Sequence, residues 1–519
     1  MALVFDRRHA LKLGGSAALA FGTGMKPLQA NAEPKRGGAL KVAIAHGSTT
    51  DNLDPSLVEH DGTLALNNSL YNFLTEIAPD NNLIGELAES WQSSPDAKSW
   101  TFKLRSGVTF HNGKSFTAKD VVASINYHRG PDSKSVAKSM VDAIVDVRTS
   151  GEMEVIFDLS SGNADFPYVV SSFHLAIKAS VEGKISPLDG IGTGPYMLEA
   201  FEPGIRYLLK RNPNYWKVGR AHFDTIEVLT ISDTTARLNA LLSGEVHVVG
   251  DPDLKVIGAL ETRSDIRVEK LSGNLHYSIP MRCTQAPFDD KNVRNALKWA
   301  VDRQLMVDTI LYGYGKVGND TPIGYANRYR AIPEELPQRE FDADRAKFHL
   351  REAGLTSLKV SLHTSLAVFG GAIDAALLYS ESARKTGIEI EVVREPADAY
   401  WSNVWMVKPW CFSYYSGRPT EDWMFSMVYD SHAKWNETFW KNDRFDSLLL
   451  QARSELSDEK RREMYVEMQK ILHEEGGQVV PVFPDFVFAS SVKIAHDKMS
   501  SNFNMDGQRF SERWWFENT

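Results

Sequence analysis

The chain has 519 residues, of which 43% are hydrophobic and 24% are charged, which is typical of a globular protein of two to four domains. This composition excludes a disordered, collagen-like or disulfide-scaffold protein. The first 32 residues carry a net charge of +3, so the remainder is acidic, near −12. Because an acidic body repels nucleic acid and anionic lipid, we predict no nucleic-acid partner.

The N-terminus has the order of parts found in an export signal. A basic segment, "DRRHALK", is followed by the apolar run "LGGSAALAFGTGM" and by "ANA" before Glu33. The apolar run is shorter than the roughly 20 residues that a membrane-spanning helix needs. We expect cleavage after Ala32, with residues 1–32 as a twin-arginine-like signal and a Sec signal as the alternative. Either route predicts a mature protein in the periplasm.

The rest of the chain alternates short β-like runs with amphipathic helices, which predicts an α/β fold. Residues 99–110, "SWTFKLRSGVTF", alternate apolar and polar side chains as half-buried strands do. Residues 289–313 have helical apolar spacing, with Asp289 or Asp290 as the N-cap and Gly313 at the end.

Two more elements follow near the C-terminus. A helix is expected to stop at Gly387, before the strand-like run "IEIEVV", and residues 458–475 are expected to form a helix that ends at Gly476 and Gly477. The strand "QVVPVF" then follows. We find no internal repeat and no low-complexity linker after residue 36, so the domains should be closely joined.

Sequence motifs for catalysis are missing. "GVTFHNGKS" has five residues between its glycines where a phosphate-binding loop has four, and "HEEGG" at His473 lacks the second histidine of a zinc motif. The mature chain has no Gly-x-Ser-x-Gly motif. The histidines at 46, 60, 174, 276 and 432 share no metal-ligand spacing. We therefore predict a binding protein that is not an enzyme and that needs no cofactor or resident metal.

Several motifs occur in an order that resembles one protein family. They are "LAESWQSSPDAKSWTFKLRSGVTFHNGKSFTAKDVVASINY" (87–127), "GTGPYML" (192–198), "KRNPNYW" (210–216), "APFDDKNVRNALKWAVDRQLM" (286–306) and "MDGQRFSERWW" (505–515). Together they resemble the extracytoplasmic solute-binding proteins of the peptide/nickel class, family 5. The resemblance implies a protein that captures a solute for an ATP-driven (ABC) importer and acts with the permease subunits of that importer. A monomer is expected.

The resemblance also implies the architecture, a two-lobed periplasmic-binding-protein clamshell of type II with an extra domain and hinge-connected lobes. Lobe I is expected to comprise residues 33–72, 192–284 and 485–519. An accessory domain is expected at 73–191 and lobe II at 285–484. Closure about the hinge is the expected motion.

The segment "WCFSYYSGRPTEDWMF", Trp410 to Phe425, is unusual because it combines six aromatic residues with three charged ones. In peptide-binding relatives, a similar segment faces the cleft and carries an aspartate that binds the peptide ammonium. Ser413 occupies that position here, and a hydroxyl cannot neutralise a desolvated ammonium. We expect Glu421 or Asp422 to supply the negative charge instead.

Other residues of this region complete the predicted ligand site. Arg418 is suited to a ligand carboxylate. Further walls are expected from the residues Tyr71, Tyr414, Tyr415, Trp423, His432, Trp435 and Asn436. Trp410 and Phe425 are instead expected in the core. A site with charged ends and aromatic walls favours a peptide or a small zwitterionic, nitrogenous solute, such as an amino-acid conjugate or an opine-like compound.

Two alternatives remain open. Nickel-chelate or haem capture would need a histidine at the cleft, and His432 is the candidate. An extracytoplasmic hydrolase is the alternative from another class. The resemblance further suggests a disulfide between Cys283 and Cys411, which an exported protein could form; two free thiols are the alternative.

Overall fold

The computed structural model describes residues 34–517. The predicted export signal, residues 1–32, and its cleavage site lie outside the described residues. None of the described helices combines the length and the apolar character needed to cross a bilayer.

A ten-stranded mixed sheet organises the molecule. Strand β1 is parallel to β12 and β13, and the remaining pairs are antiparallel. Eight strands follow the order β10 (Tyr196–Glu202), β11 (Arg206–Arg211), β12 (Thr225–Thr230), β1 (Ala39–Ile44), β13 (Val248–Gly250), β20 (Gln478–Ser491), β15 (His276–Pro280) and β19 (Ser413–Tyr415). Strands β14 (Ile266–Ser272) and β16 (Gly315–Val317) also pair with β20.

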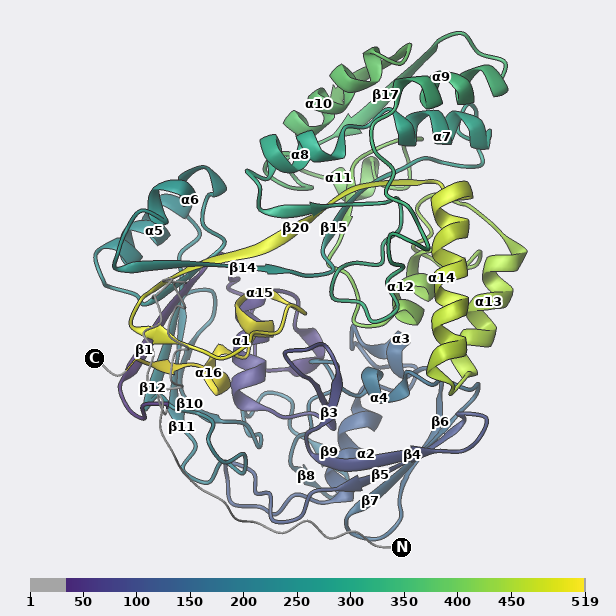
Figure 1. Cartoon of the computed structure of the whole chain (residues 1–519). Coiled ribbons are helices and arrows are strands. Elements are labelled where there is room, and N and C mark those ends of the chain that lie inside the picture. The colour runs from purple at the N-terminus through teal and green to yellow at the C-terminus, as the bar shows by residue number, and fades with distance from the viewer. Residues whose placement is uncertain (1–33, 518–519) are drawn as a thin grey trace, which may run out of the picture.

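The long strand β20 belongs to both lobes (Figure 1). Its first half pairs with β15 and β16, and its second half pairs with β13 and β14. The change of partner falls between Pro484, which pairs with Gly315, and Asp485, which pairs with Ser272. The two lobes are therefore joined through a continuous strand, as the predicted α/β clamshell requires.

Lobe I packs helices against the β1 side of this sheet. Its core contains Leu40, Val42, Ile226 and Trp514, all fully buried. Its other elements are the short helix Pro55–Leu57, α1 (Asp61–Leu70), α5 (Thr234–Leu242), α6 (Leu254–Leu260), α15 (Asn504–Gln508), α16 (Phe510–Arg513), β21 (Ile494–Ala495) and β22 (Trp515–Phe516).

A separate four-stranded antiparallel sheet has a core of its own, formed around Phe102, Phe157 and Phe166. Its strands are β4 (Ala88–Ser93), β5 (Ser99–Leu104), β7 (Glu154–Leu159) and β6 (Ile144–Thr149). Near it lie β2 (Thr75–Ile77), β3 (Leu83–Gly85), α2 (Ala118–Tyr127), α3 (Lys138–Val141), α4 (Phe166–Val169), β8 (Ser180–Val181) and β9 (Lys184–Ile185). The predicted alternation is confirmed in β5. We call this part the small sheet domain; the predicted residue boundaries of the domains stay predictions.

Lobe II contains the parallel pair β17 (Leu358–Thr364) and β18 (Ile388–Arg394). Its helices are α7 (Lys291–Trp299), α8 (Arg303–Ile310), α9 (Ala343–Glu352), α10 (Ala372–Arg384), α11 (Tyr400–Asn403), α12 (Glu421–Val428), α13 (Asp443–Ser454) and α14 (Asp458–Glu475). The single helix expected over 289–313 is wrong. Asp290 caps α7 as predicted, but Asp302 caps a new helix, because its side chain accepts the Leu305 N–H at 3.0 Å.

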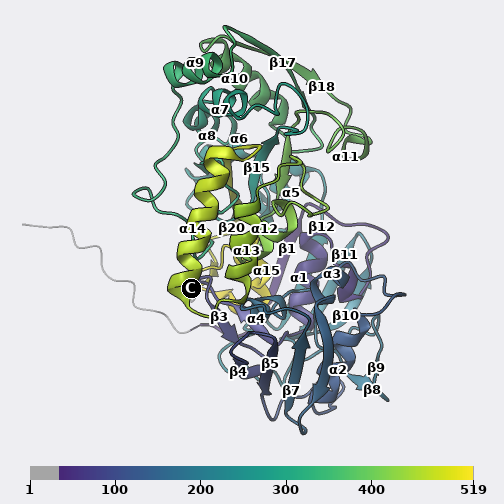
Figure 2. The ribbon, with the colours of Figure 1, turned by 90° about the vertical axis from the view of Figure 1, so that its right-hand side faces the viewer.

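Lobe II also contacts the small sheet domain directly (Figures 1 and 2). Arg461 of α14 forms a 2.6 Å ion pair with Asp165, and both side chains are buried. The Ala164 N–H donates to the Arg453 carbonyl at 2.7 Å. The two halves of the molecule are therefore held together by polar contacts as well as by β20.

Both cysteines are free thiols. Met281 lies opposite Trp410, and the Arg282 N–H donates to the Pro409 carbonyl, so Cys411 lies three positions along this antiparallel ladder from Cys283. Three strand residues span about 10 Å, which exceeds the roughly 7 Å between Cα atoms that a disulfide permits. The structure contradicts the predicted Cys283–Cys411 disulfide.

Candidate ligand-binding cleft

A cavity of about 390 Å³ lies where the two lobes and the small sheet domain meet. Lobe II contributes Ser416, Gly417, Arg418, Pro419, Trp423 and Trp435; the small sheet domain contributes Val136, Met140, Ser171, Ser172, Phe173 and His174; lobe I contributes, among others, Leu64, Asn68, Phe503, Asp506, Arg509 and Arg513. Small-molecule sites commonly measure about 300–1,000 Å³. The cavity is at the lower end of that range.

The lobe II wall is built by a strand, a turn and a helix start. β19 pairs with β15, and the chain then turns at Gly417, which has a φ of +79°. A Cβ atom at Gly417 would lie 2.4 Å from that of Asn274, so only glycine fits there. Thr420 caps α12 by accepting the Trp423 N–H at 3.3 Å. This geometry directs Arg418 and Trp423 into the cavity.

Arg418 has no carboxylate within ion-pair distance among residues 34–517. One guanidinium N–H group donates to the Gly417 carbonyl at 2.6 Å, and another lies 3.2 Å from the Met427 sulfur. The guanidinium is 5.8 Å from the centre of the Trp423 ring. Burial lowers the pKa of Arg418. Because a desolvated cation without an anion costs free energy, a negatively charged ligand group is favoured here.

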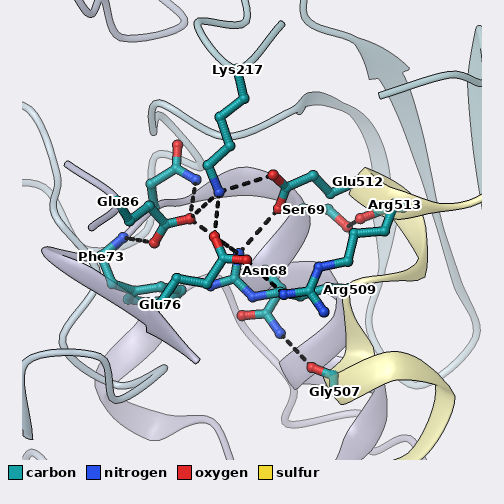
Figure 3. Close-up of polar contacts among 12 residues, drawn as sticks. Asn68, Ser69, Phe73, Glu76, Glu86, Lys217, Gly507, Arg509, Glu512 and Arg513 are labelled. Atoms are coloured by element: carbon teal, nitrogen blue, oxygen red, sulfur yellow. Dashed lines mark hydrogen bonds and ion pairs between the residues drawn. The ribbon is translucent and has the colours of Figure 1, made fainter. Parts of the chain in front are cut away.

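The opposite wall carries two arginines that are fully neutralised (Figure 3). Arg509 lies 3.1 Å from both Glu86 and Glu512 and 3.4 Å from Glu76. Burial alone would lower the pKa of Arg509, but these three carboxylates raise it well above its usual value. Arg513 pairs with Glu76 at 2.6 Å and with Asp506 at 2.8 Å.

The three glutamates also surround the ammonium of Lys217, which lies 2.5 Å from Glu76, 2.7 Å from Glu86 and 2.9 Å from Glu512. Three convergent carboxylates could hold a metal ion. Here the Lys217 ammonium occupies the centre of the group (Figure 3). We therefore interpret this network as structural.

The remaining walls are mainly apolar. The ring centres of Phe173 and Phe503 lie 5.6 Å apart. Trp435, another wall residue, is 47% exposed. Burial lowers the pKa of His174 to about 4, so the imidazole is neutral at physiological pH. The cavity therefore combines one unneutralised cation, Arg418, and the exposed Glu59 with mainly apolar and aromatic walls.

Of the predicted site residues, Arg418, Trp423 and Trp435 line the cavity. Glu421 and Asp422 do not. They lie on the lobe II side of the first turn of α12, where Glu421 accepts the Tyr329 N–H at 2.7 Å and Asp422 pairs with Arg453 at 3.1 Å. Neither carboxylate is placed to bind a ligand ammonium.

Alternation along β19 explains three further placements. Ser413 and Tyr415 point into the protein and are buried, whereas Tyr414 points the other way and is 41% exposed. The Tyr414 ring lies 5.5 Å from that of Trp401, outside the cavity lining.

The other predicted wall residues also lie elsewhere. The His432 side chain is 87% exposed, and Asn436 is buried, where it donates to the Trp440 carbonyl at 2.7 Å. Tyr71 is buried; its hydroxyl donates to the Leu53 carbonyl and accepts from Lys178, both at 3.1 Å. Trp410 and Phe425 are fully buried, as predicted.

Five further cavity residues were not predicted from the sequence: Phe173, His174, Phe503, Arg509 and Arg513. A signal was present for the last two. The motif "MDGQRFSERWW" combines four charged side chains with three large rings next to a glycine, a composition as unusual as that of the 410–425 segment.

Comparisons with known proteins agree with this geometry. The glutathione-binding protein GsiB of Pectobacterium atrosepticum is 24% identical over 478 residues, which cover 88% of this chain and 91% of that protein. HbpA2 of Haemophilus parasuis superposes with a TM-score of 0.82 at 21% identity, covering 93% of this chain and 100% of that chain. DppA of Helicobacter pylori, solved with the peptide STSA, has a TM-score of 0.75 at 23% identity, covering 93% of this chain and 99% of that chain.

The two structures confirm the two-lobed periplasmic-binding-protein fold. Residues 82–437, more than half of the chain, match the family described as bacterial extracellular solute-binding proteins, family 5 middle. The chain belongs to the family 5 solute-binding proteins, which bind peptides or related solutes for ABC importers.

Proposed function

We propose that this protein captures a small solute with one anionic group and a mainly apolar body, and delivers it to the permease of an ABC importer. The observation that carries this proposal is Arg418, a half-buried cation that faces the cavity without a carboxylate partner among the described residues. A ligand carboxylate could form paired hydrogen bonds with the guanidinium.

The size of the cavity supports a short ligand. A volume of about 390 Å³ suits a dipeptide, a tripeptide or an amino-acid conjugate better than a long peptide. The names of the relatives agree with this class, since one binds glutathione and another was solved with the four-residue peptide STSA.

The alternatives receive less support. Nickel-chelate or haem capture would use His432, which lies outside the cavity lining. His174 does line it, but its Nε2 is within 3.0 Å of the Val58 carbonyl and its Nδ1 within 3.4 Å of the Ser172 hydroxyl. No nucleophile or metal motif in the sequence supports the hydrolase alternative, and relatives such as GsiB bear the names of binding proteins.

We further propose that the mature protein starts at Glu33 and acts in the periplasm as a monomer. N-terminal sequencing and light scattering of exported protein test this. A chain that retains Met1 in the cytosol, or a stable dimer, would contradict it.

The function is tested by identifying the natural ligand. Protein purified under native conditions is denatured, and the released small molecules are analysed by mass spectrometry. We expect a compound with a carboxylate or another anionic group, whose affinity falls in Arg418→Gln and is unchanged in Arg345→Gln, a change at an exposed arginine of α9. A neutral or purely cationic ligand would overturn the proposal.

A further inference from the structure

The small sheet domain is bound to lobe I by several buried ion pairs (Figure 3). Glu76 pairs with Arg509 at 3.4 Å and with Arg513 at 2.6 Å. Glu86 pairs with Lys217 at 2.7 Å and with Arg509 at 3.1 Å. Because each carboxylate of the small sheet domain binds two cations of lobe I, we expect these two parts to move as one body.

The contact between the small sheet domain and lobe II is of a different kind. Asp165 accepts a hydrogen bond from Arg461 at 2.6 Å, and each of the two side chains is only 7% exposed. The second carboxylate oxygen of Asp165 and the Nε atom of Arg461 are buried without a partner among the described residues. Both charges regain water when the two surfaces separate, so a pair of this kind can break and form again.

Helix α14 connects this ion pair to the strand that crosses between the lobes (Figure 1). Arg461 is on the first turn of α14, and the other end of the helix, Glu475, is followed by β20, which begins at Gln478. The 14 residues from Arg461 to Glu475 span about 21 Å of helix. A rotation of roughly 10° that swings α14 about its β20 end would move Arg461 by about 4 Å, which breaks the pair.

The same contact is continuous with two opposite walls of the ligand cavity. Asp165 directly precedes α4, which leads to the wall residue Phe173. On the lobe II side, the Arg453 carbonyl accepts the Ala164 N–H at 2.7 Å. The Arg453 guanidinium pairs with Asp422, the neighbour of the wall residue Trp423. Separation of the two surfaces therefore moves these walls apart.

We propose that Asp165 and Arg461 form a latch that holds lobe II closed over the ligand cavity. When the latch opens, the wall at Phe173 separates from the wall at Trp423, and a solute can enter or leave. Loss of either charge leaves the other charge buried and unpaired in the closed form but hydrated in the open form, which shifts the equilibrium toward opening. The latch acts whatever solute is bound, so it does not depend on Arg418.

The test compares the wild type with Asp165→Asn and Arg461→Met, which break the latch from opposite sides. Asp165 makes no capping hydrogen bond to α4, so asparagine leaves the start of that helix unchanged. Glu335→Gln is the matched control. It removes the 2.6 Å ion pair with Arg462, the next residue of α14, and both of these partners belong to lobe II.

All four proteins are purified and dialysed identically, without added solute. Small-angle X-ray scattering then measures the radius of gyration, and hydrogen exchange follows individual amides. The Ala164 amide reports on the contact, because it donates to the Arg453 carbonyl. The amide of Leu472, which is buried further along α14, reports on the fold of lobe II.

We expect both latch variants to have a larger radius of gyration than the wild type and the control. Exchange of the Ala164 amide should become at least about tenfold faster in them, while exchange at Leu472 is unchanged. An unchanged radius of gyration in both latch variants would overturn the proposal. Exchange at Ala164 no faster than in Glu335→Gln would also overturn it.

Discussion

Arg418 and Arg509 face the same cavity from opposite walls, but their surroundings differ completely. Arg509 lies within 3.4 Å of three glutamates, whereas Arg418 contacts a carbonyl, a sulfur atom and an aromatic ring. Buried charges are stable only when they are paired. The comparison therefore separates a cation whose partners belong to the protein from a cation whose partner is to come with the ligand.

The largest expected effect is a loss of protein stability when Arg509 is replaced. Arg509→Met leaves Glu76, Glu86 and Glu512 with fewer cations, and should reduce the free energy of unfolding by about 3–5 kcal/mol. Urea denaturation measures this loss. The exposed control Arg345→Met should change stability by less than about 0.5 kcal/mol. A comparably small loss in Arg509→Met would mean that the network is not structural.

A similar loss is expected within the 410–425 segment, at a position that does not face the cavity. Phe425 is fully buried and packs against Phe445 with ring centres 5.2 Å apart. Phe425→Ala should destabilise the protein by about 3–5 kcal/mol. Urea denaturation curves measure this loss. A Phe425→Ala variant with normal stability and poor ligand binding would contradict the placement of Phe425 in the core.

The pH dependence of stability tests whether Glu421, a buried carboxylate of lobe II, serves the fold and not the ligand site. Burial raises the pKa of Glu421 to about 7. The folded protein therefore holds this proton more tightly than the unfolded chain does. The stabilisation is complete below the pKa of an unfolded glutamate, about 4.5, and is lost as the pH rises through 7.

Glu421→Gln should accordingly stabilise the protein at pH 8, by up to about 3 kcal/mol, and have little effect at pH 4. Melting curves at both pH values measure this, with the exposed Glu459→Gln as the control. Ligand affinity should be unchanged. A loss of affinity in Glu421→Gln would instead show that Glu421 contributes to ligand binding.

The smallest of these effects concerns the aromatic wall. Trp435→Ala should weaken ligand binding by about 1–2 kcal/mol through loss of contact area, without a change in melting temperature. Trp401→Ala is the matched control, because Trp401 is similarly exposed but does not line the cavity. Equal losses of affinity in both variants would show that Trp435 does not contact the ligand as a wall of the cavity.

Local features of the fold were predictable from the sequence because they depend on neighbouring residues. The N-cap at Asp290, the strand after Gly387 and the helix end at Gly476 all follow short-range rules. The break between α7 and α8 was not predicted, because apolar spacing continues through Ala300 and Val301 while Asp302 starts a new helix.

The site was predictable only in part, for a related reason. An unusual composition identified the segment that holds Arg418 and Trp423. It could not show that Glu421 and Asp422 bind Tyr329 and Arg453, which are distant in sequence. Nor could it show that Arg418 and Arg509, which are distant in sequence, line one cavity.

The central claim is that Arg418 binds the ligand while Arg509 holds the fold together. It is tested most directly by calorimetric titration of Arg418→Gln with the ligand released from the wild-type protein, alongside melting curves. We expect a loss of about 2–5 kcal/mol in binding free energy, or roughly 30-fold to several-thousand-fold in affinity, with an unchanged or higher melting temperature. Normal affinity together with a much lower melting temperature would show that Arg418 is structural, and would contradict this account.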